Sequence, residues 1–349
     1  MFSRGRILAR MFARLVLLFV AVQLVAGSVV FFAVLAVPGD PVSLRLKNPD
    51  PVRVAEERAR LGLDRPVLVQ WWLHQRGFLA GDWGRSVNTG RDVRADFAEF
   101  FPATVELALG ALVLGTIIGV STAVGAEVFH AGWLRRFSVL LGTLGLTVPI
   151  FWIGLILLIV GSLVLGWFPS GGRYDLAALS PPWRTGLLSI DALLAGDFAA
   201  CGTALRHLAL PALCLSLYPA AQVCGILIAR LHDPKLRTLL VSLRARGLGP
   251  GRIWTRHIVR VVGAPLLTVI GSNFGTLLGG AVLTETVFSW PGIGRYLVDA
   301  VINRDLYVVQ NVLLFVLILV IGVVLATDLA ARWIHPEGLR DEHEREEGA

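Results

Sequence analysis

The sequence has 349 residues, of which 55% are hydrophobic and 16% charged, and its formal net charge is +7. Soluble domains contain about 45–50% apolar and about 25% charged residues. Here the apolar excess lies in long runs separated by short charged stretches, which indicates a membrane protein. Many arginines flank those runs, where they orient a chain in a bilayer, so the positive charge does not indicate a nucleic-acid partner.

Lysine usage excludes a P-loop nucleotide site. The only lysines are Lys47 and Lys235, and they follow Leu46 and Pro234. A phosphate-binding P-loop needs the sequence Gly-Lys-Ser/Thr. We therefore expect any hydrolysis of ATP, with its Mg²⁺, to take place on a partner subunit.

Cysteines and histidines show no metal-ligand pattern. The seven histidines are scattered and form no His-Glu-x-x-His motif. We predict no metal site, no cofactor and no catalytic residue in this chain. Three cysteines without metal-ligand spacing are interpreted as small apolar fillers in or near membrane helices: Cys201, Cys214 and Cys224.

The first apolar run, about 16–37, predicts a membrane span. A secretory signal peptide shares its basic start and apolar core, but this run is longer than a typical signal core. The following Pro-Gly-Asp-Pro at 38–41 is not a small-x-small cleavage site. We expect a retained helix with a cytoplasmic N-terminus. Four arginines precede it: Arg4, Arg6, Arg10 and Arg14.

Residues 38–101 are polar and turn-rich, with one weakly helical stretch at about 51–61. Because they follow the first span of a chain with a cytoplasmic N-terminus, we expect them on the extracytoplasmic side. The second predicted inner loop carries the basic stretch 230–260. Pro149 lies inside the third span, where a membrane helix tolerates it if neighbours satisfy the freed carbonyl. Five further apolar runs predict spans at about 103–128, 138–165, 208–228, 264–288 and 308–333.

These spans predict an all-α polytopic integral membrane protein with six transmembrane helices. Its cytoplasmic loop between the fourth and fifth spans is expected to hold a coupling helix. All arginine-rich segments then fall on one side, as the positive-inside rule requires, so both termini are predicted to be cytoplasmic. We expect an N-terminal helix plus extracytoplasmic segment at 1–101, a five-helix transmembrane domain at 102–335 and a charged cytoplasmic tail at 336–349.

The inner stretch 236–260 predicts a helix, a break and a second helix. Leucines recur with helical spacing from Leu236 to Leu243, so one face is apolar. The break is Gly-Leu-Gly-Pro-Gly at 247–251, where proline cannot continue a helix. Arg252, Arg256 and Arg260 form one stripe of the second helix. This shape fits a partner's groove, and it equally fits an interfacial hairpin whose arginines meet lipid phosphates.

The stretch 284–305 predicts an outer turn before the last span. Pro291 and Gly292 end the fifth span, and a short helix follows, with Arg295 and Asp299 able to pair at i and i+4. The aromatic residues of this stretch suit a membrane–water interface. An ordinary re-entrant anchor is the alternative. One face of the short helix is apolar: Ile293, Tyr296, Leu297, Ala300 and Val301.

Two motifs resemble one family. Leu243-Arg-Ala-Arg-Gly247, with His257 and Pro265 downstream, resembles the conserved loop of binding-protein-dependent transport permeases, most closely the dipeptide/oligopeptide/nickel branch. Residues 285–295 resemble the Glu-x-Val-Phe-x-Trp-Pro-Gly-x-Gly-Arg block of that branch. Further blocks at 38–41, 81–86, 102–107 and 208–212 agree in order, so the resemblance covers roughly residues 15–335. It departs at 241–243, where Val-Ser-Leu stands in place of the usual start of the loop.

The resemblance implies the permease subunit of an ATP-driven importer in the bacterial inner membrane. It would work with a second homologous permease, two ATP-binding subunits, an extracytoplasmic solute-binding protein and membrane lipid, by alternating access. The implied ATPase-coupling residues are Arg244, Ala245, Arg246, Gly247, Gly249, Gly251 and His257. The implied outer gate or turn comprises Glu285, Phe288, Trp290, Pro291, Gly292, Gly294 and Arg295.

Polar residues inside spans are functional candidates. Asn273, in mid-span, is predicted to face the solute pathway or the second permease. An ion-coupled secondary transporter is the alternative function, and it predicts paired mid-membrane acids and an inverted repeat, neither of which is found. A membrane enzyme and a structural assembly factor are weaker alternatives. Peptides, nickel chelates and related solutes fit the sequence equally well. The other polar candidates are Gln23, Glu106, Glu127, Glu285 and Asp328.

Overall fold

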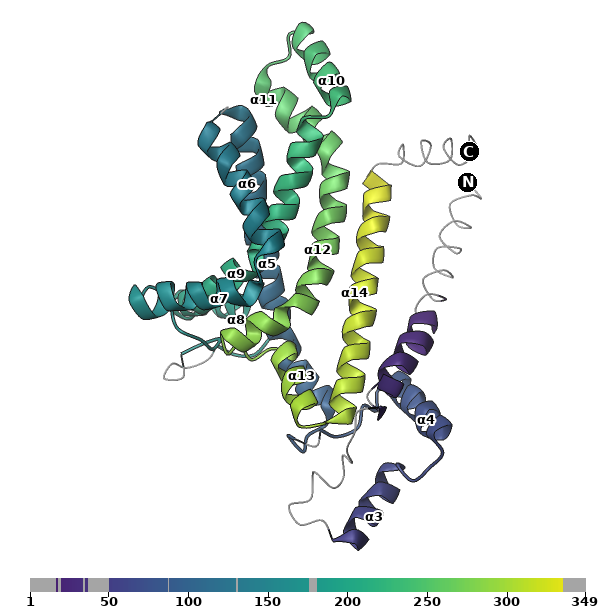
Figure 1. Cartoon of the computed structure of the whole chain (residues 1–349). Helices are drawn as coiled ribbons and strands as arrows, with labels where there is room; N and C mark the ends of the chain where they lie inside the picture. Colours follow the sequence, from purple (N-terminus) through teal and green to yellow (C-terminus); the bar gives the residue numbers. More distant parts are fainter. Residues whose placement is uncertain are drawn as a thin grey trace. The chain divides into compact units, whose positions relative to one another are not determined.

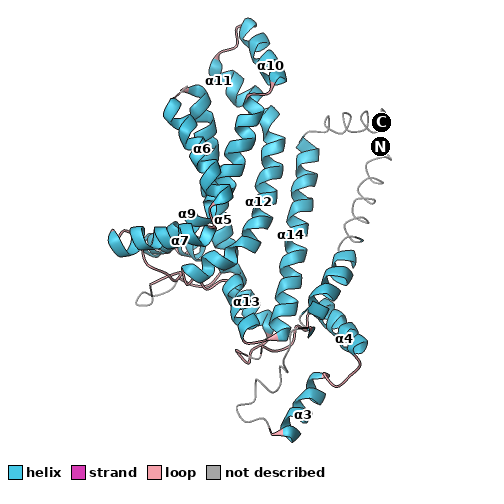
Figure 2. Cartoon of the chain, in the orientation of Figure 1, coloured by secondary structure: helices cyan, strands magenta, loops and turns pink. Residues whose placement is uncertain are grey.

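The computed structural model describes residues 17, 20–33, 35–36, 50–86, 88–129, 131–175 and 181–334. These residues form helices joined by turns and loops (Figure 2), with one isolated β-bridge between Arg85 and Asp92. The chain divides into two compact units. The N-terminal unit comprises Met1–Phe101 and Ile293–Leu319, and the main unit comprises Pro102–Gly292 and Val320–Ala349. The predicted tail at 336–349 lies outside the described residues.

Two long helices pass from one unit into the other, α5 (Val93–Val128) and α14 (Leu306–Ile334). The N-terminal unit adds a helix at Val20–Ala33, α3 (Pro51–Leu61), α4 (Val67–Ala80) and α13 (Ile293–Ile302). The main unit adds α6 (Gly132–Thr147), α7 (Ile150–Leu157), η1 (Leu158–Val164), α8 (Leu188–Leu194), α9 (Phe198–Leu231), α10 (Pro234–Ala245), α11 (Pro250–Arg252), η2 (Ile253–Ile258) and α12 (Val259–Val287) (Figure 1).

Four of the described helices are long and apolar enough to cross a membrane: α5, α9, residues Pro265–Val287 of α12 and residues Leu306–Thr327 of α14. The pair formed by α6 and α7–η1 makes a fifth candidate if it counts as one span. The described part of the predicted first span is the shorter apolar helix Val20–Ala33. The chain is therefore an all-helical protein with four or five membrane-spanning candidates in its described part.

The predicted third span is not one continuous helix. It bends by 113° between α6 and α7 (Figure 1). Val148 at the bend is extended, with ψ of 130°, because the ring of Pro149 disfavours helical geometry in the residue before it. Pro149 then precedes the first residue of α7, where its missing N–H costs no helical hydrogen bond. The prediction that one membrane helix continues through Pro149 is therefore wrong.

Residues 67–80 also differ from the prediction of a polar, turn-rich segment, because they form the apolar helix α4. Gln75 of α4 is buried and accepts a hydrogen bond of 2.8 Å from Nε2 of Gln23 in the first apolar helix. Gly27 leaves room for this contact, since a Cβ there would lie 2.6 Å from Nε2 of Gln75. The helix was missed because it is too short to read as a span.

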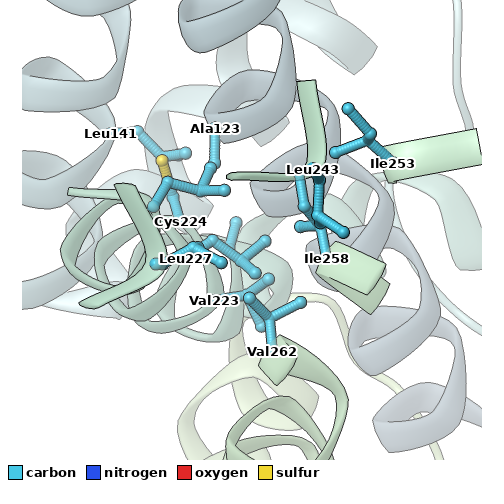
Figure 3. Close-up of a cluster of buried hydrophobic side chains, with 12 residues drawn as sticks. Ala123, Leu141, Val223, Cys224, Leu227, Leu243, Ile253, Ile258 and Val262 are labelled. Carbon is cyan, nitrogen blue, oxygen red and sulfur yellow. The ribbon is translucent and has the colours of Figure 1, made fainter. Parts of the chain in front are cut away.

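The core of the main unit reaches the end of the bundle that carries α10 and η2. Figure 3 shows Leu243, Ile253 and Ile258 beside side chains of α9. Leu227 and Leu231 of α9 belong to the same buried cluster. The apolar face expected for the 236–260 stretch is thus packed against its own subunit.

Candidate functional site

The basic turn between α10 and η2 has a defined backbone. Gly247 follows the end of α10 with φ of +78°, a left-handed conformation that glycine adopts without strain. Its N–H donates to the carbonyl oxygen of Arg244 at 2.9 Å, and the N–H of Leu248 donates to that of Leu243 at 3.3 Å. Pro250 then begins α11, as suits a residue without an N–H donor.

The turn has exposed charged residues next to buried apolar ones. Leu243, Ile253 and Ile258 are buried, whereas the residues from Arg244 to Gly247 are exposed. Among the other predicted coupling residues, Gly249 and Gly251 are exposed and His257 is half-buried. The structure therefore brings the predicted coupling residues together on one short segment. Arg252, Arg256 and Arg260 extend the exposed basic surface.

A cavity of about 240 Å³ lies behind the turn, and Glu127, Arg244 and Trp254 contribute to its lining. Residues from the turn and from the end of α5 therefore line the same cavity. The segment η2 that follows is a π-helix, a geometry that is rare and frequent at functional sites.

The predicted outer turn closes on the first residues of the main unit. Trp290 donates from Nε1 to the carbonyl oxygen of Ala103 at 2.9 Å, and Thr104 donates from its hydroxyl to Glu285. The side chain of Glu285 is 0% exposed. Gly292 lies against it so closely that a Cβ would overlap the Glu285 carboxylate. The turn is thus a buried hydrogen-bonded structure and not an exposed loop.

The structure divides the predicted outer residues between the two units. Glu285 to Gly292 belong to the main unit, whereas Gly294 and Arg295 belong to α13 of the N-terminal unit. Phe288 is buried beside Leu210. In α13, Gly294 is buried and Arg295 is exposed.

A second buried network, which the sequence did not reveal, surrounds Glu106. The guanidinium of Arg173 pairs with Glu106, with an Nε–Oε2 distance of 2.9 Å, and also donates to the carbonyl oxygen of Gly186. Ser189 donates to Oε1 of Glu106 from its backbone N–H at 2.7 Å and from its hydroxyl at 2.6 Å. Loop 166–197 is therefore tied to α5 by a buried ion pair.

Asp191 orders the same loop. It accepts hydrogen bonds from the backbone N–H groups of Arg184, Thr185 and Gly186 and from the Thr185 hydroxyl. Burial alone would raise the pKa of the Asp191 carboxyl, but these donors outweigh it and hold the pKa below its ordinary value.

The N-terminal unit joins two sequence blocks that lie far apart in the chain. Asp305 accepts from the Ser86 hydroxyl at 2.6 Å, and Asn311 donates to the carbonyl oxygen of Trp83 at 3.1 Å. The hydroxyl of Tyr296 donates to Asp96 at 3.0 Å. Burial raises the pKa of Tyr296, so this hydroxyl stays protonated. Block 81–86 could be recognised as a motif in the sequence, but its contact with residues 305–311 is seen only in the folded structure.

Asn273, the predicted pathway residue, is 4% exposed, and its Nδ2 finds no hydrogen-bond partner among the described residues. It lies inside its own subunit, and its role stays a prediction. Glu127 pairs loosely with His232, with 3.7 Å between Oε2 and Nε2. The side chain of Asp328 lies outside what the structure describes.

The fold and these sites define a class of protein. The described residues form several apolar helices. Some of the loops between them contain buried, hydrogen-bonded polar side chains, and another carries the exposed basic turn. Within that described part, no group of three His, Cys, Asp or Glu side chains could hold a metal ion. This is the organisation of a multi-pass membrane protein.

The chain belongs to the family of binding-protein-dependent transport system inner membrane components, which matches residues 112–337. The N-terminal region of such membrane components matches residues 6–108. The protein is accordingly a permease subunit of an ABC importer of the dipeptide/oligopeptide branch, located in the inner membrane, and not an enzyme. An ion-coupled secondary transporter finds no support.

Three relatives illustrate the similarity. The chain is 38% identical over 317 residues to a di/tripeptide transport system permease protein of Pseudomonas aeruginosa, covering 90% of this chain and 93% of the relative. It is 35% identical over 305 residues to the dipeptide transport system permease protein of Escherichia coli, covering 86% and 90%. A peptide transport system permease protein of Salmonella typhimurium is 32% identical over 269 residues, covering 76% and 84%.

Proposed function

We propose that this permease admits short peptides, of two or three residues, to the cell. The relatives named for di- and tripeptide transport match it along nearly their whole length. Nickel chelates, which the sequence left open, are the second candidate.

The working transporter contains two permeases, this chain and a homologous one, above two ATP-binding subunits. A solute-binding protein docks on the extracytoplasmic side and delivers the peptide. ATP and Mg²⁺ bind only to the ATPase subunits. Six spans, with a cytoplasmic N-terminus and a cytoplasmic C-terminus, place the basic turn beneath the membrane and the Glu106 and Glu285 networks outside it.

The basic turn couples ATP hydrolysis to transport. One observation carries this proposal: Leu243 is buried, and the four residues that follow it are exposed, namely Arg244, Ala245, Arg246 and Gly247. Leu243 packs against α9. A displacement of the turn by the ATPase is therefore transmitted to this spanning helix. The arginines offer charge-assisted hydrogen bonds to a partner surface.

Alternating access follows from this coupling. Closure of the ATPase pair moves the coupling turns, the permeases open outward, and the peptide enters from the binding protein. Hydrolysis of ATP then returns the pathway to the inward-facing state. The permease acts as a two-state element whose equilibrium two partners shift.

The test reconstitutes the permease in liposomes with its partner permease, its ATPases and its binding protein. We expect ATP-dependent uptake of a labelled dipeptide, and no uptake by this chain alone. Competition by unlabelled di- and tripeptides, but not by nickel chelates, identifies the substrate. Uptake by this chain alone would contradict the importer assignment, whereas ATP-dependent uptake of nickel without peptide competition would contradict only the substrate.

A further inference from the structure

A groove of about 310 Å³ lies between three helices of the main unit, at the end of the bundle that carries the basic turn. Its walls come from the last turns of α5, the first turns of α6 and the last turns of α9. Half of the lining residues are aliphatic, including Ala123, Val139 and Ile228, and His232 also lines the groove. Gly225 forms part of its wall, and a Cβ there would meet nothing within 4 Å.

Charged groups of opposite sign lie at this groove. Arg135 of α6 and Glu127 of α5 both line it, together with Ser138. The guanidinium of Arg135 makes no ion pair with any described residue. Glu127 is 33% exposed, and its only described ion pair is the long one with His232. A carboxylate and a guanidinium are therefore both available to an occupant.

The surroundings place this groove at a membrane surface. Phe129 and Trp133, which flank the lining residues in the chain, are strongly exposed. Tryptophan is enriched at the level of lipid headgroups, where its amphipathic ring sits, so Trp133 indicates this level. The aliphatic part of the groove then lies at the depth of acyl chains, and Arg135 and Glu127 lie at the depth of phosphates and amines.

We propose that the groove binds a phospholipid whose headgroup carries both a phosphate and a primary ammonium, that is, a phosphoethanolamine lipid. Arg135 pairs with the phosphate and Ser138 lies beside it. Glu127 accepts hydrogen bonds from the ammonium, which has three N–H donors. The upper part of one acyl chain covers the aliphatic wall around Gly225. A choline headgroup has no N–H to offer Glu127, and a glycerol headgroup offers no positive charge.

The test measures lipid retention by the full-length permease. The protein is extracted in mild detergent, exchanged into equimolar mixtures of phosphatidylethanolamine, its N-methylated forms, phosphatidylcholine and phosphatidylglycerol, and stripped stepwise. Retained lipid is measured by native mass spectrometry. We expect preferential retention of phosphatidylethanolamine, with a stepwise loss of preference as the amine is methylated.

Variants assign the two contacts. Glu127→Gln should abolish the preference over phosphatidylcholine, and Arg135→Gln should lower retention of every phospholipid. Arg136→Gln is the matched control, because Arg136 is an exposed neighbour that does not line the groove, and it should retain the wild-type preference. Gly225→Leu fills the groove from its opposite wall and should abolish retention. Gly202→Leu, a similarly open glycine of α9, should not.

Three results would overturn the proposal. Equal retention of phosphatidylethanolamine and phosphatidylcholine by the wild type would show a groove covered by annular lipid only. A preference for phosphatidylglycerol would show an anionic-lipid site. A preference unchanged in both Glu127→Gln and Gly225→Leu, in protein that elutes as a single folded species, would place the lipid elsewhere.

Discussion

Glu106 is a carboxylate near the end of a predicted span, where an ordinary interfacial position would cost little. Its side chain is instead 6% exposed and paired with Arg173. This pairing could not be predicted from the sequence, because the two residues are separated by 67 positions and no local pattern links them. The position of Glu106 on its helix was predictable, but its partner was not.

Glu106→Gln is expected to destabilise the main unit by about 3–5 kcal/mol, because it leaves the buried guanidinium of Arg173 without a counter-charge. The midpoint of thermal unfolding, measured on purified protein in detergent, checks this. Glu99→Gln is the matched control on the same helix. It removes an exposed pair with Arg91, which water screens, and should leave the midpoint unchanged. Equal effects of the two variants would contradict a special role for Glu106.

Gly292→Ala tests the packing of the outer turn. The added methyl group must displace the Glu285 carboxylate, which is buried and accepts from Thr104. Overpacking of this kind costs about 1–3 kcal/mol, so we expect lower thermal stability and reduced uptake. Gly280→Ala, where a Cβ meets nothing within 4 Å, should be neutral or slightly stabilising. A wild-type melting midpoint in Gly292→Ala would show that the turn is loose.

Helices on the scale of a whole span were largely predictable. The runs at 103–128, 208–228 and 308–333 fall within α5, α9 and α14, and the run at 264–288 ends one residue beyond α12, because twenty consecutive apolar residues leave few alternatives to a helix. The bend at Pro149 was not predictable in size, since the cost of continuing a helix through proline depends on its neighbours. The short helix α4 was missed for lack of length.

Gly247→Pro is expected to uncouple ATP hydrolysis from uptake while leaving membrane insertion intact. Proline fixes φ near −65°, whereas Gly247 has φ of +78°, so the turn cannot keep its path. The ratio of ATP hydrolysed to peptide imported, in reconstituted transporter, is the measurement. Gly263→Ala, at an open position of α12, is the control. Wild-type uptake in Gly247→Pro would count against the coupling role.

In each of the two units, buried hydrogen bonds join blocks that lie far apart in the sequence. Buried hydrogen bonds join sequence blocks 81–86 and 303–311 in the N-terminal unit and blocks 103–106 and 285–292 in the main unit. Three of the blocks that resemble the family, 81–86, 102–107 and 285–295, therefore take part in buried contacts, whereas the 243–247 loop is mostly exposed. Their identity could be recognised in the sequence, whereas the grouping into two units depends on contacts between distant residues.

Orientation of the whole molecule in the membrane is open to a direct test. All three native cysteines are buried, so a membrane-impermeant thiol reagent should leave the wild type largely unlabelled. His257→Cys should be labelled in inverted vesicles and Asn303→Cys in intact spheroplasts, because the two positions are predicted on opposite sides. Labelling of His257→Cys from the outside would reverse the predicted topology and remove the basic turn from the reach of an ATPase.

The π-helical geometry of η2 has a rotational consequence. A π-turn accommodates one residue more than an α-turn, and each residue of an α-helix advances about 100° around the axis. The side chains before η2 therefore point in directions that a continuous α-helix running back from α12 would not give them. The one extra residue in the π-turn thus sets the direction in which the arginines point relative to the spanning part of α12. Loss or gain of that residue would rotate the basic surface about the helix axis without unfolding either helix.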